Sequence, residues 1–329
     1  MTNMIAKVPM GKEGVLVGRQ GLGCMGMSEF YGAADPDASR RVLDLALDLG
    51  VTHFDTADMY FSPPADMYGV GANEEFLAPF LRDNRKRAHI ATKYGYRRSL
   101  DTPDDWGVTN DPAHIHRAVD ASLHRLGVEV IDLYYMHRRD PAVPLADSIG
   151  AMADLVQAGK VRALGLCEVS ATELSEAHAI HPIAALQSEW SVFSRDIEAE
   201  VAATAARLGT AIVPFAPLGR GLLTGALSLA ADDARRHFPR FSEANLDANT
   251  RAAQVIGALA AARGVSPAQI ALAWLHDRAR VFGVTVIPIP GTRQPARLRE
   301  NLGALDITLT ADELATLAPL AAQVQGQRV

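Results

Sequence analysis

Short apolar runs alternate with longer amphipathic segments along this 329-residue chain. The runs are rich in β-branched residues, which is typical of buried strands, whereas the segments repeat apolar residues every three or four positions, which is typical of helices. Eight predicted strands lie near 19–23 and at 53–55, 89–92, 131–136, 161–166, 184–187, 211–215 and 284–288. Predicted helices between them span 39–49, 73–81, 114–126, 145–158, 172–179, 197–208 and 295–302.

The strict alternation of strands and helices predicts a parallel sheet with helical crossovers. Eight strands with their helices favour an α/β fold of the (β/α)8 TIM-barrel type over an open, doubly wound sheet. Outside this repeat we expect an N-terminal β-hairpin at the barrel floor, two long loops, and two consecutive extra helices toward the C-terminus, at 8–17, 97–111, 218–249, 250–263 and 267–278. Because there is neither a linker nor a domain-scale repeat, we expect one domain over 1–329.

Charge and cysteine content exclude several classes of protein. The net charge is −6 with both signs interspersed, so neither a nucleic-acid surface nor a polybasic membrane surface is indicated. No apolar run is long enough to span a bilayer, and the first ten residues lack the apolar stretch of a signal peptide. Cys24 and Cys167 cannot form a disulfide framework, so we expect both to be reduced and to lie near strand ends at the mouth of the site. These features favour a cytoplasmic enzyme, either a monomer or a homo-oligomer.

One glycine-rich motif resembles a dinucleotide-binding fingerprint. Residues 21–26, GLGCMG, match the pattern G-x-G-x-x-G. That fingerprint works only where a helix opens at the last glycine, and the following residues, MSEFYG, are not a helix start. We therefore expect these glycines to let the backbone approach a ligand at the top of the first strand.

Four polar side chains lie at or just after the ends of three consecutive predicted strands, where barrel enzymes place their catalytic groups. They are Asp55, Tyr60, Lys93 and His137. A carbonyl that accepts a hydride becomes an alkoxide and needs a proton, which the Tyr60 phenol can supply. We expect Lys93 to lower the pKa of that phenol, Asp55 to balance Lys93, and a neutral His137 to orient the carbonyl oxygen.

Over nearly its whole length the sequence resembles the aldo-keto reductases. The stretches that carry the resemblance are 22–28, 54–60 (FDTADMY), 69–77, 91–95, 159–165, 187–191, 214–223 and 289–301. The resemblance implies reduction of a small-molecule aldehyde or ketone to an alcohol with NADPH, and it assigns the catalytic tetrad to Asp55, Tyr60, Lys93 and His137.

The resemblance also implies contacts with NADPH. Phe215 would stack on the nicotinamide, Gln187 would hold its carboxamide, and residues 217–222 would cross the pyrophosphate. The start of the last predicted helix would bind the 2′-phosphate, which suits the positive end of a helix and guanidinium groups. The implied cofactor-binding residues are Gly23, Cys24, Met25, Asp55, Cys167, Glu168, Gln187, Phe215, Ala216, Pro217, Leu218, Gly219, Arg220, Gly221, Gly291, Thr292, Arg293, Arg297, Glu300 and Asn301.

This chain departs from the family pattern in three places. Cys167-Glu168 stands where Ser-Asn or Ser-Glu is usual, and 187–190 read QSEW instead of the commoner QYEY. The sequence ADMY at 57–60 recurs at 65–68, so Tyr60 and Tyr68 are both candidate proton donors. We expect Tyr60, because Asp55 and Lys93 are fixed by strands while a downstream insertion can bulge outward.

Two other functions remain open at this point. The protein could be a cofactor-sensing binding subunit of low catalytic activity, although its complete tetrad argues against this. It could also be an aldolase or lyase that uses Lys93 as a Schiff-base former, although Asp55 would keep that lysine charged. No spacing of His, Cys and Asp supports a metal site. The sequence does not name the substrate.

Overall fold

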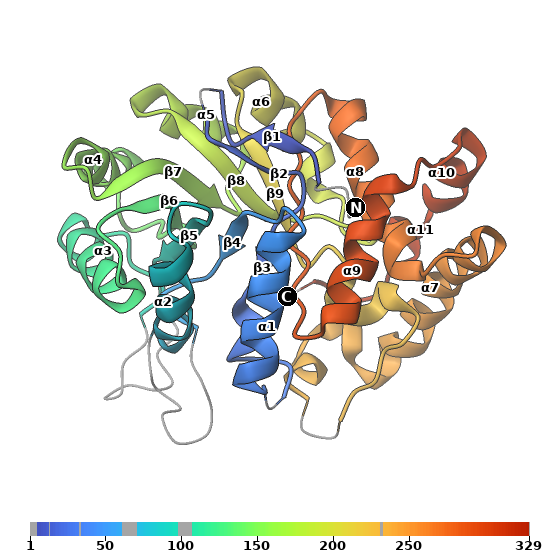
Figure 1. Ribbon diagram of the computed structural model, residues 1–329. Helices are drawn as coiled ribbons and strands as arrows, with labels where there is room; N and C mark the ends of the chain where they lie inside the picture. Colours follow the sequence, from blue (N-terminus) through green and yellow to red (C-terminus); the bar gives the residue numbers. More distant parts are fainter. Residues whose placement is uncertain are drawn as a thin grey trace.

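The fold is a ring of parallel strands surrounded by helices (Figure 1). The computed structural model describes residues 5–328 apart from Glu13, Ala33 and the segments 61–70, 98–106 and 231–232. Seven strands pair side by side in chain order, all parallel: β3 (Leu22–Gly23), β4 (His53–Asp55), β5 (His89–Tyr94), β6 (Ile131–Met136), β7 (Val161–Cys167), β8 (Ile183–Glu189) and β9 (Ala211–Phe215). The predicted barrel is therefore confirmed.

The eighth predicted strand, at 284–288, differs from the prediction. Within the described residues, its only bridge joins Val286 to Ile212 of β9. Further backbone bonds nevertheless close the ring: the amides of Ile287 and Ile289 donate to β9 at 2.9 and 3.1 Å, and the amide of Gly21 donates to the Pro288 carbonyl at 2.9 Å. Because a proline has no backbone N–H, Pro288 and its neighbour Pro290 cannot donate to a regular ladder.

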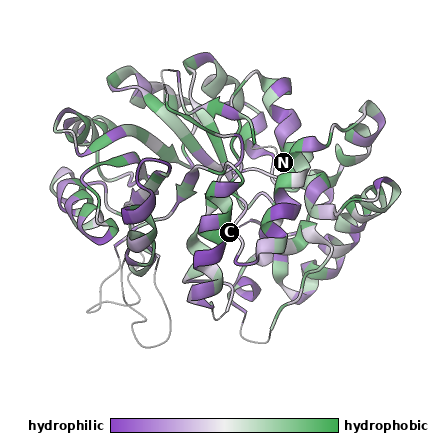
Figure 2. Cartoon of the chain, in the orientation of Figure 1, coloured by the Kyte–Doolittle hydropathy of each residue, from purple (hydrophilic) through white to green (hydrophobic). Residues whose placement is uncertain are grey.

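Helices return the chain from each strand to the next and cover the outside of the barrel (Figure 1). The side chains of Asp35 and Asp111 accept backbone N–H groups at the starts of the helices that follow them in the chain. Gly127 and Gly209 end the helices that precede them, with positive φ values of 64° and 73°. Figure 2 shows apolar colouring along the barrel strands and mixed colouring on the surrounding helices. The crossover helices after the first six strands are α1 (Pro36–Asp48), α2 (Ala72–Asn84), α3 (Pro112–Leu126), α4 (Leu145–Gln157), α5 (Ala171–Ile180) and α6 (Val201–Leu208). The helix α9 (Pro295–Gly303) follows the last barrel segment.

The remaining elements lie mostly after β9. The helix α7 (Glu243–Arg263) begins well before the predicted start at 250, because its first turns, EANLDAN, are helical without the apolar repeat on which the prediction relied. In the described part of the chain no single helix is both long and apolar enough to span a membrane. The pair formed by α7 and the next helix, Pro267–Phe282, meets both conditions only together, and the two are bent by 98°. The other elements are α8 (Pro267–Phe282), α10 (Ala311–Leu317), α11 (Leu320–Gln323), and the 3-10 turns η1 (Met25–Met27), η2 (Asp196–Glu198), η3 (Gly219–Thr224), η4 (Ala234–His237), η5 (Pro239–Phe241) and η6 (Ala304–Asp306).

The predicted N-terminal hairpin is present and closes one end of the barrel. Strands β1 (Lys7–Pro9) and β2 (Leu16–Gly18) pair antiparallel. Met10 and Val17 are buried in the same apolar cluster as Ala91 and Leu133 of the barrel strands. The turn lies so close to the start of β8 that a Cβ on Gly11 would be 2.9 Å from the Cα of Ala184. The hairpin thus covers the end of the barrel opposite the C-terminal strand ends.

A buried histidine pair in the barrel leads to a prediction on acid stability. Nδ1 of His53 and Nδ1 of His89 are 3.0 Å apart at the N-terminal ends of β4 and β5. Burial lowers the pKa of His89 to about 4 and holds that of His53 well below its usual value. Below about pH 6.5 the unfolded chain therefore binds more protons than the folded chain. Protonation of the histidines favours the unfolded chain, so the free energy of unfolding decreases as the pH falls from about 6.5 toward 4.

Urea unfolding at several pH values between 7.5 and 4.5 tests this expectation. We expect the free energy of unfolding of His89→Asn to fall less steeply with decreasing pH than that of the wild type, by up to about 1.4 kcal/mol per pH unit for one proton. His116→Asn, which changes an exposed histidine of α3, should keep the wild-type slope. Parallel curves for His89→Asn and the wild type would contradict the prediction, whatever the absolute loss of stability.

Candidate active site

The C-terminal ends of β4, β5 and β6 bring the predicted tetrad together. The Lys93 ammonium donates to Asp55 Oδ1 at 2.5 Å and to the Thr56 carbonyl at 2.7 Å. It also donates to the Tyr60 hydroxyl at 3.4 Å. The side chains of Lys93 and Asp55 are 0% and 4% exposed, so this ion pair is shielded from water and competing ions. Lys93 therefore links the carboxylate and the phenol.

Tyr60 lies between the lysine and the histidine. Its ring meets the ring of His137 edge to face, with centroids 6.0 Å apart at 85°. Tyr96 packs against His137 in the same way, with centroids 5.0 Å apart at 87°. Among the described residues, His137 Nδ1 has no hydrogen-bond partner. Tyr68, the second candidate proton donor, lies outside the described residues, so its place relative to Lys93 stays open.

Burial controls the protonation of these groups. It raises the pKa of the Tyr60 phenol to about 12, and the Lys93 ammonium only partly opposes that rise. Lys93 thus lowers this pKa as expected, but desolvation of the phenolate is the larger effect, so the net shift is upward. Burial, followed by the charge of Lys93, holds the pKa of His137 well below its usual value, so the imidazole is neutral at pH 7 as expected.

The charged state of Lys93 follows from a balance. Burial is the largest effect on the pKa of its ammonium and alone would lower it, but the Asp55 carboxylate, Tyr60 and Cys167 together outweigh burial and raise that pKa above the ordinary value. Asp55 in turn receives a second hydrogen bond, because Gln187 Nε2 donates to Oδ2 at 2.7 Å. Each oxygen of the buried carboxylate thus has a donor, and the pair is stable in its charged form.

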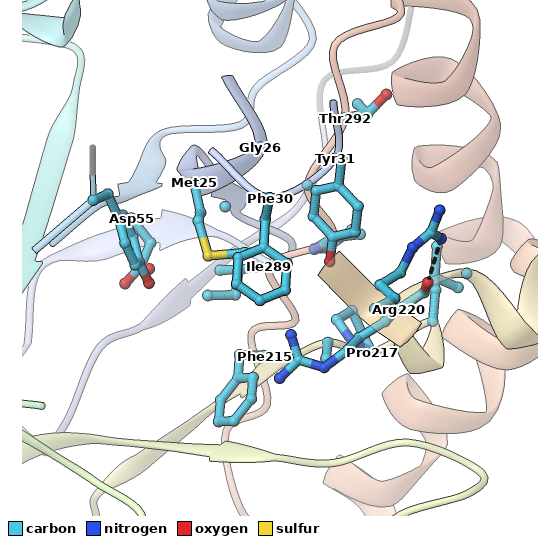
Figure 3. A pocket seen from close by; sticks show the side chains of 18 of the residues that line it. Met25, Gly26, Phe30, Tyr31, Asp55, Phe215, Pro217, Arg220, Ile289 and Thr292 are labelled. Carbon is cyan, nitrogen blue, oxygen red and sulfur yellow. Dashed lines mark hydrogen bonds between the residues drawn. The ribbon is translucent and has the colours of Figure 1, made fainter. Parts of the chain in front are cut away.

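A cavity of about 750 Å³ opens from the tetrad along the C-terminal face of the barrel. Figure 3 shows Asp55 at the left of it and Thr292 at the upper right, with the side chains of Phe30 and Tyr31 between them and those of Phe215 and Arg220 below. The cofactor residues expected from sequence that line it are Gly23, Met25, Asp55, Cys167, Gln187, Phe215, Ala216, Pro217, Leu218, Arg220, Gly221, Gly291, Thr292, Arg293 and Arg297.

The other five expected residues do not line this cavity. The Cys24 thiol points to the Leu22 carbonyl at 3.6 Å, which also places it away from the mouth where both cysteines were expected. Glu300 forms an ion pair with Arg297 at 2.7 Å. Gly219 and Asn301 are buried.

Glu168, the fifth, is held by the C-terminal segment. The Arg328 guanidinium donates to its two carboxylate oxygens at 2.8 and 2.5 Å, and the Glu189 amide donates to Oε1 at 2.7 Å. The Glu168 backbone has a φ of 54°, in the left-handed region that non-glycine residues seldom adopt. The side chain therefore turns toward the C-terminal segment and is not part of the cavity wall.

The cavity has further lining residues that the sequence did not reveal. Phe30 and Phe238 stack with ring centroids 5.8 Å apart, and the Arg220 guanidinium lies 4.4 Å from the Phe238 ring centre. Met59, Tyr96 and Arg138 adjoin the tetrad. These residues sit in loops or just past strand ends, where no periodic pattern marks the side that faces a ligand.

Most of the chain matches one protein family. The chain belongs to the aldo/keto reductases, because the model of that family matches residues 20–322. Among solved structures, it is similar to the glycerol dehydrogenase from Gluconobacter oxydans, with 28% identity, a TM-score of 0.82, and coverage of 98% of this chain and 96% of the other.

Two further structures support the same assignment. An aldo/keto reductase from Klebsiella pneumoniae in complex with NADP and acetate is 26% identical, with a TM-score of 0.73 and 96% of each chain covered. A thermostable aldo-keto reductase in complex with the inhibitor epalrestat is 25% identical, with a TM-score of 0.72 and coverage of 96% of this chain and 100% of the other. The resemblance seen in the sequence is therefore confirmed, and the protein is an oxidoreductase of this family.

Proposed function

We propose that this protein reduces the carbonyl group of an aldehyde or ketone with NADPH, using Tyr60 as the proton donor. The observation that carries the proposal is the contact of Lys93 with both Asp55 and Tyr60 at the mouth of a large cavity. When bound, NADPH would supply the hydride. The chain's own residues must hold the carbonyl, deliver a proton and bind an anionic cofactor.

Tyr60 has the protonation state that a proton donor requires. With a pKa of about 12 its phenol is protonated at neutral pH. As the proton leaves, the nearby Lys93 ammonium stabilises the negative charge that develops on the phenol oxygen. The neutral phenol carries no such charge, so this electrostatic stabilisation acts mainly in the transition state.

His137 and Asp55 play different parts. A neutral His137 beside the Tyr60 ring can donate a hydrogen bond to the carbonyl oxygen and position it for protonation. Asp55 holds Lys93 in place and keeps it charged. Because both oxygens of Asp55 already accept hydrogen bonds, we propose that it acts through Lys93 instead of touching the substrate.

The far end of the cavity fits a polyanionic cofactor. Arg220, Arg293 and Arg297 all line it, and α9 begins there with no acidic residue in its first turn. The Arg293 guanidinium donates to the carbonyls of Tyr31 and Gly32 at 2.7 and 2.9 Å, which ties the loop after β3 to the start of α9. We propose that Arg297, whose side chain is 48% exposed, meets the 2′-phosphate that distinguishes NADPH from NADH.

This assignment predicts a preference for NADPH that depends on Arg297. A well-formed charge-assisted contact contributes roughly 1.5–3 kcal/mol, so Arg297→Ala should weaken NADPH binding by about tenfold or more and leave NADH binding nearly as it was. Arg299→Ala removes the same charge from the exposed side of the same helix, away from the cavity, and should have little effect. Fluorescence titration of both cofactors measures this directly. Equal affinity of the wild type for NADPH and NADH would refute the assignment.

The Schiff-base alternative is disfavoured by the geometry around Lys93. An amine forms a Schiff base only when neutral, and here the buried carboxylate raises the pKa of Lys93. The cofactor-sensing alternative is tested by turnover. NADPH absorbance should fall steadily with a panel of aldehydes and ketones, whereas a sensing subunit would bind NADPH and oxidise it very slowly.

A further inference from the structure

In the described part of the cavity wall, Arg138 is the one cation next to the tetrad that neither the catalytic step nor the cofactor phosphates require. It directly follows His137, and Asn110 Nδ2 donates to its carbonyl at 3.0 Å, which fixes its backbone beside the histidine. Its side chain is partly buried and lines the cavity. One guanidinium nitrogen, Nη1, donates to the His137 carbonyl at 3.0 Å, which leaves most of its N–H groups available.

Among the described residues, no carboxylate oxygen lies within 4.0 Å of the Arg138 guanidinium. The neighbouring cation differs, since Arg139 pairs with Glu173 at 3.8 Å. Glu168 is near enough for the charge of Arg138 to help lower its pKa. The Arg328 guanidinium, however, donates to both Glu168 carboxylate oxygens, at 2.8 and 2.5 Å. Glu168 therefore pairs with the C-terminal segment and does not neutralise Arg138.

The other charged groups among the described cavity residues also leave Arg138 without a carboxylate partner. The only carboxylate in its wall, among the described residues, is that of Asp55, which is committed to Lys93. Arg235 has its own acid, Asp233, at 2.7 Å. A cation without a carboxylate on a partly desolvated wall binds an anion more strongly than it would in water, because the effective dielectric is lower there.

We propose that Arg138 binds an anionic group, a carboxylate, of the carbonyl substrate, so that the enzyme favours aldehydes or ketones that carry a negative charge. This inference rests on the proposed function and names its substrate class. A guanidinium can bind a carboxylate through two parallel hydrogen bonds, which gives direction as well as affinity. Because Arg138 and His137 are adjacent, one small molecule can place its carbonyl at the tetrad and its anionic group at the arginine.

The test compares acids with their neutral esters. The substrates are the ortho, meta and para carboxybenzaldehydes and their methyl esters, so that several distances between carbonyl and carboxylate are sampled. We expect kcat/KM of the best acid to exceed that of its ester by about tenfold or more, and high salt to reduce this ratio. In Arg138→Gln, kcat/KM for that acid should fall at least about ten times more than for the ester.

Arg139→Gln is the matched control, since it removes the next charge along the chain, which does not line the cavity. It should leave the acid-to-ester ratio as in the wild type. If the wild type reduces the esters as well as the acids, and Arg138→Gln lowers both equally, the inference is wrong although the proposed function stands.

A binding measurement separates the inference from catalysis. Hydroxymethylbenzoates, the alcohol products of the same acids, can be titrated by calorimetry into the protein saturated with oxidised cofactor. Weaker binding to Arg138→Gln than to the wild type and Arg139→Gln supports the anion site even if no turnover is seen, in which case it is the proposed function that fails. Equal binding to all three proteins would overturn the inference.

Discussion

Tyr60→Phe is expected to lower kcat by about 10²–10⁴-fold, the usual contribution of a positioned general acid. The substitution keeps the ring that packs against His137 and removes only the hydroxyl near Lys93. NADPH affinity should change little, because the residues proposed for its phosphates lie at the other end of the cavity. Steady-state turnover and a fluorescence titration of NADPH, on the same preparations, separate the two effects.

Tyr68→Phe is the matched control, and we expect its turnover to stay within a few-fold of the wild type. The reverse pattern would mean that the second copy of ADMY presents its tyrosine to Lys93, which would refute the assignment to Tyr60 and keep the mechanism. A modest loss in each single variant with a collapse in the double variant would mean that the repeated segment has two registers. Full activity in the double variant would remove the tyrosine mechanism altogether.

Lys93→Met is expected to damage both stability and catalysis. Asp55 would remain buried at 3% exposure without its cation, and breaking a buried ion pair from one side costs about 3–5 kcal/mol of unfolding free energy. Turnover should fall by about 10²-fold or more, because nothing would then stabilise the charge that develops on Tyr60. Urea unfolding near pH 7 and steady-state kinetics measure the two losses.

The double variant Asp55→Asn/Lys93→Met separates these losses. It removes the unpaired buried charge, so it should regain a substantial part of the stability, yet it should remain as inactive as Lys93→Met. The stability loss of the single variant should also shrink at lower pH, where the Asp55 carboxyl is protonated. If Lys93→Met unfolds at the same urea concentration as the wild type, the ion pair does not stabilise this fold.

The sequence determined the architecture to a large extent. Strand and helix periodicities are local properties, so the strands at 53–55, 131–136 and 211–215 were predicted with the bounds that the structure has. Where the local signal was weak, the prediction missed: α7 begins in residues without an apolar repeat, and the segment at 284–288 is closed into the barrel by a few backbone bonds instead of a regular ladder.

The meeting of the proposed catalytic residues was also predictable from sequence, because parallel strands of a barrel end at one face and their last residues must meet there. Asp55 and Lys93 needed no further information, since β4 and β5 are neighbours in register. The choice between Tyr60 and Tyr68 was not determined in this way, because both tyrosines end a copy of the same local sequence, ADMY.

Only the tertiary structure decided which side chains pair across the barrel. Gln187 donates to Asp55 from 132 residues away, and Arg328 takes up Glu168 from 160 residues away. The net rise in the Tyr60 pKa likewise depends on how much water the folded loops exclude. These long-range pairs and the burial of Tyr60 depend on the closure of the whole ring. Distances between residues far apart in the chain are set by the packing of every element between them, which no local sequence pattern determines.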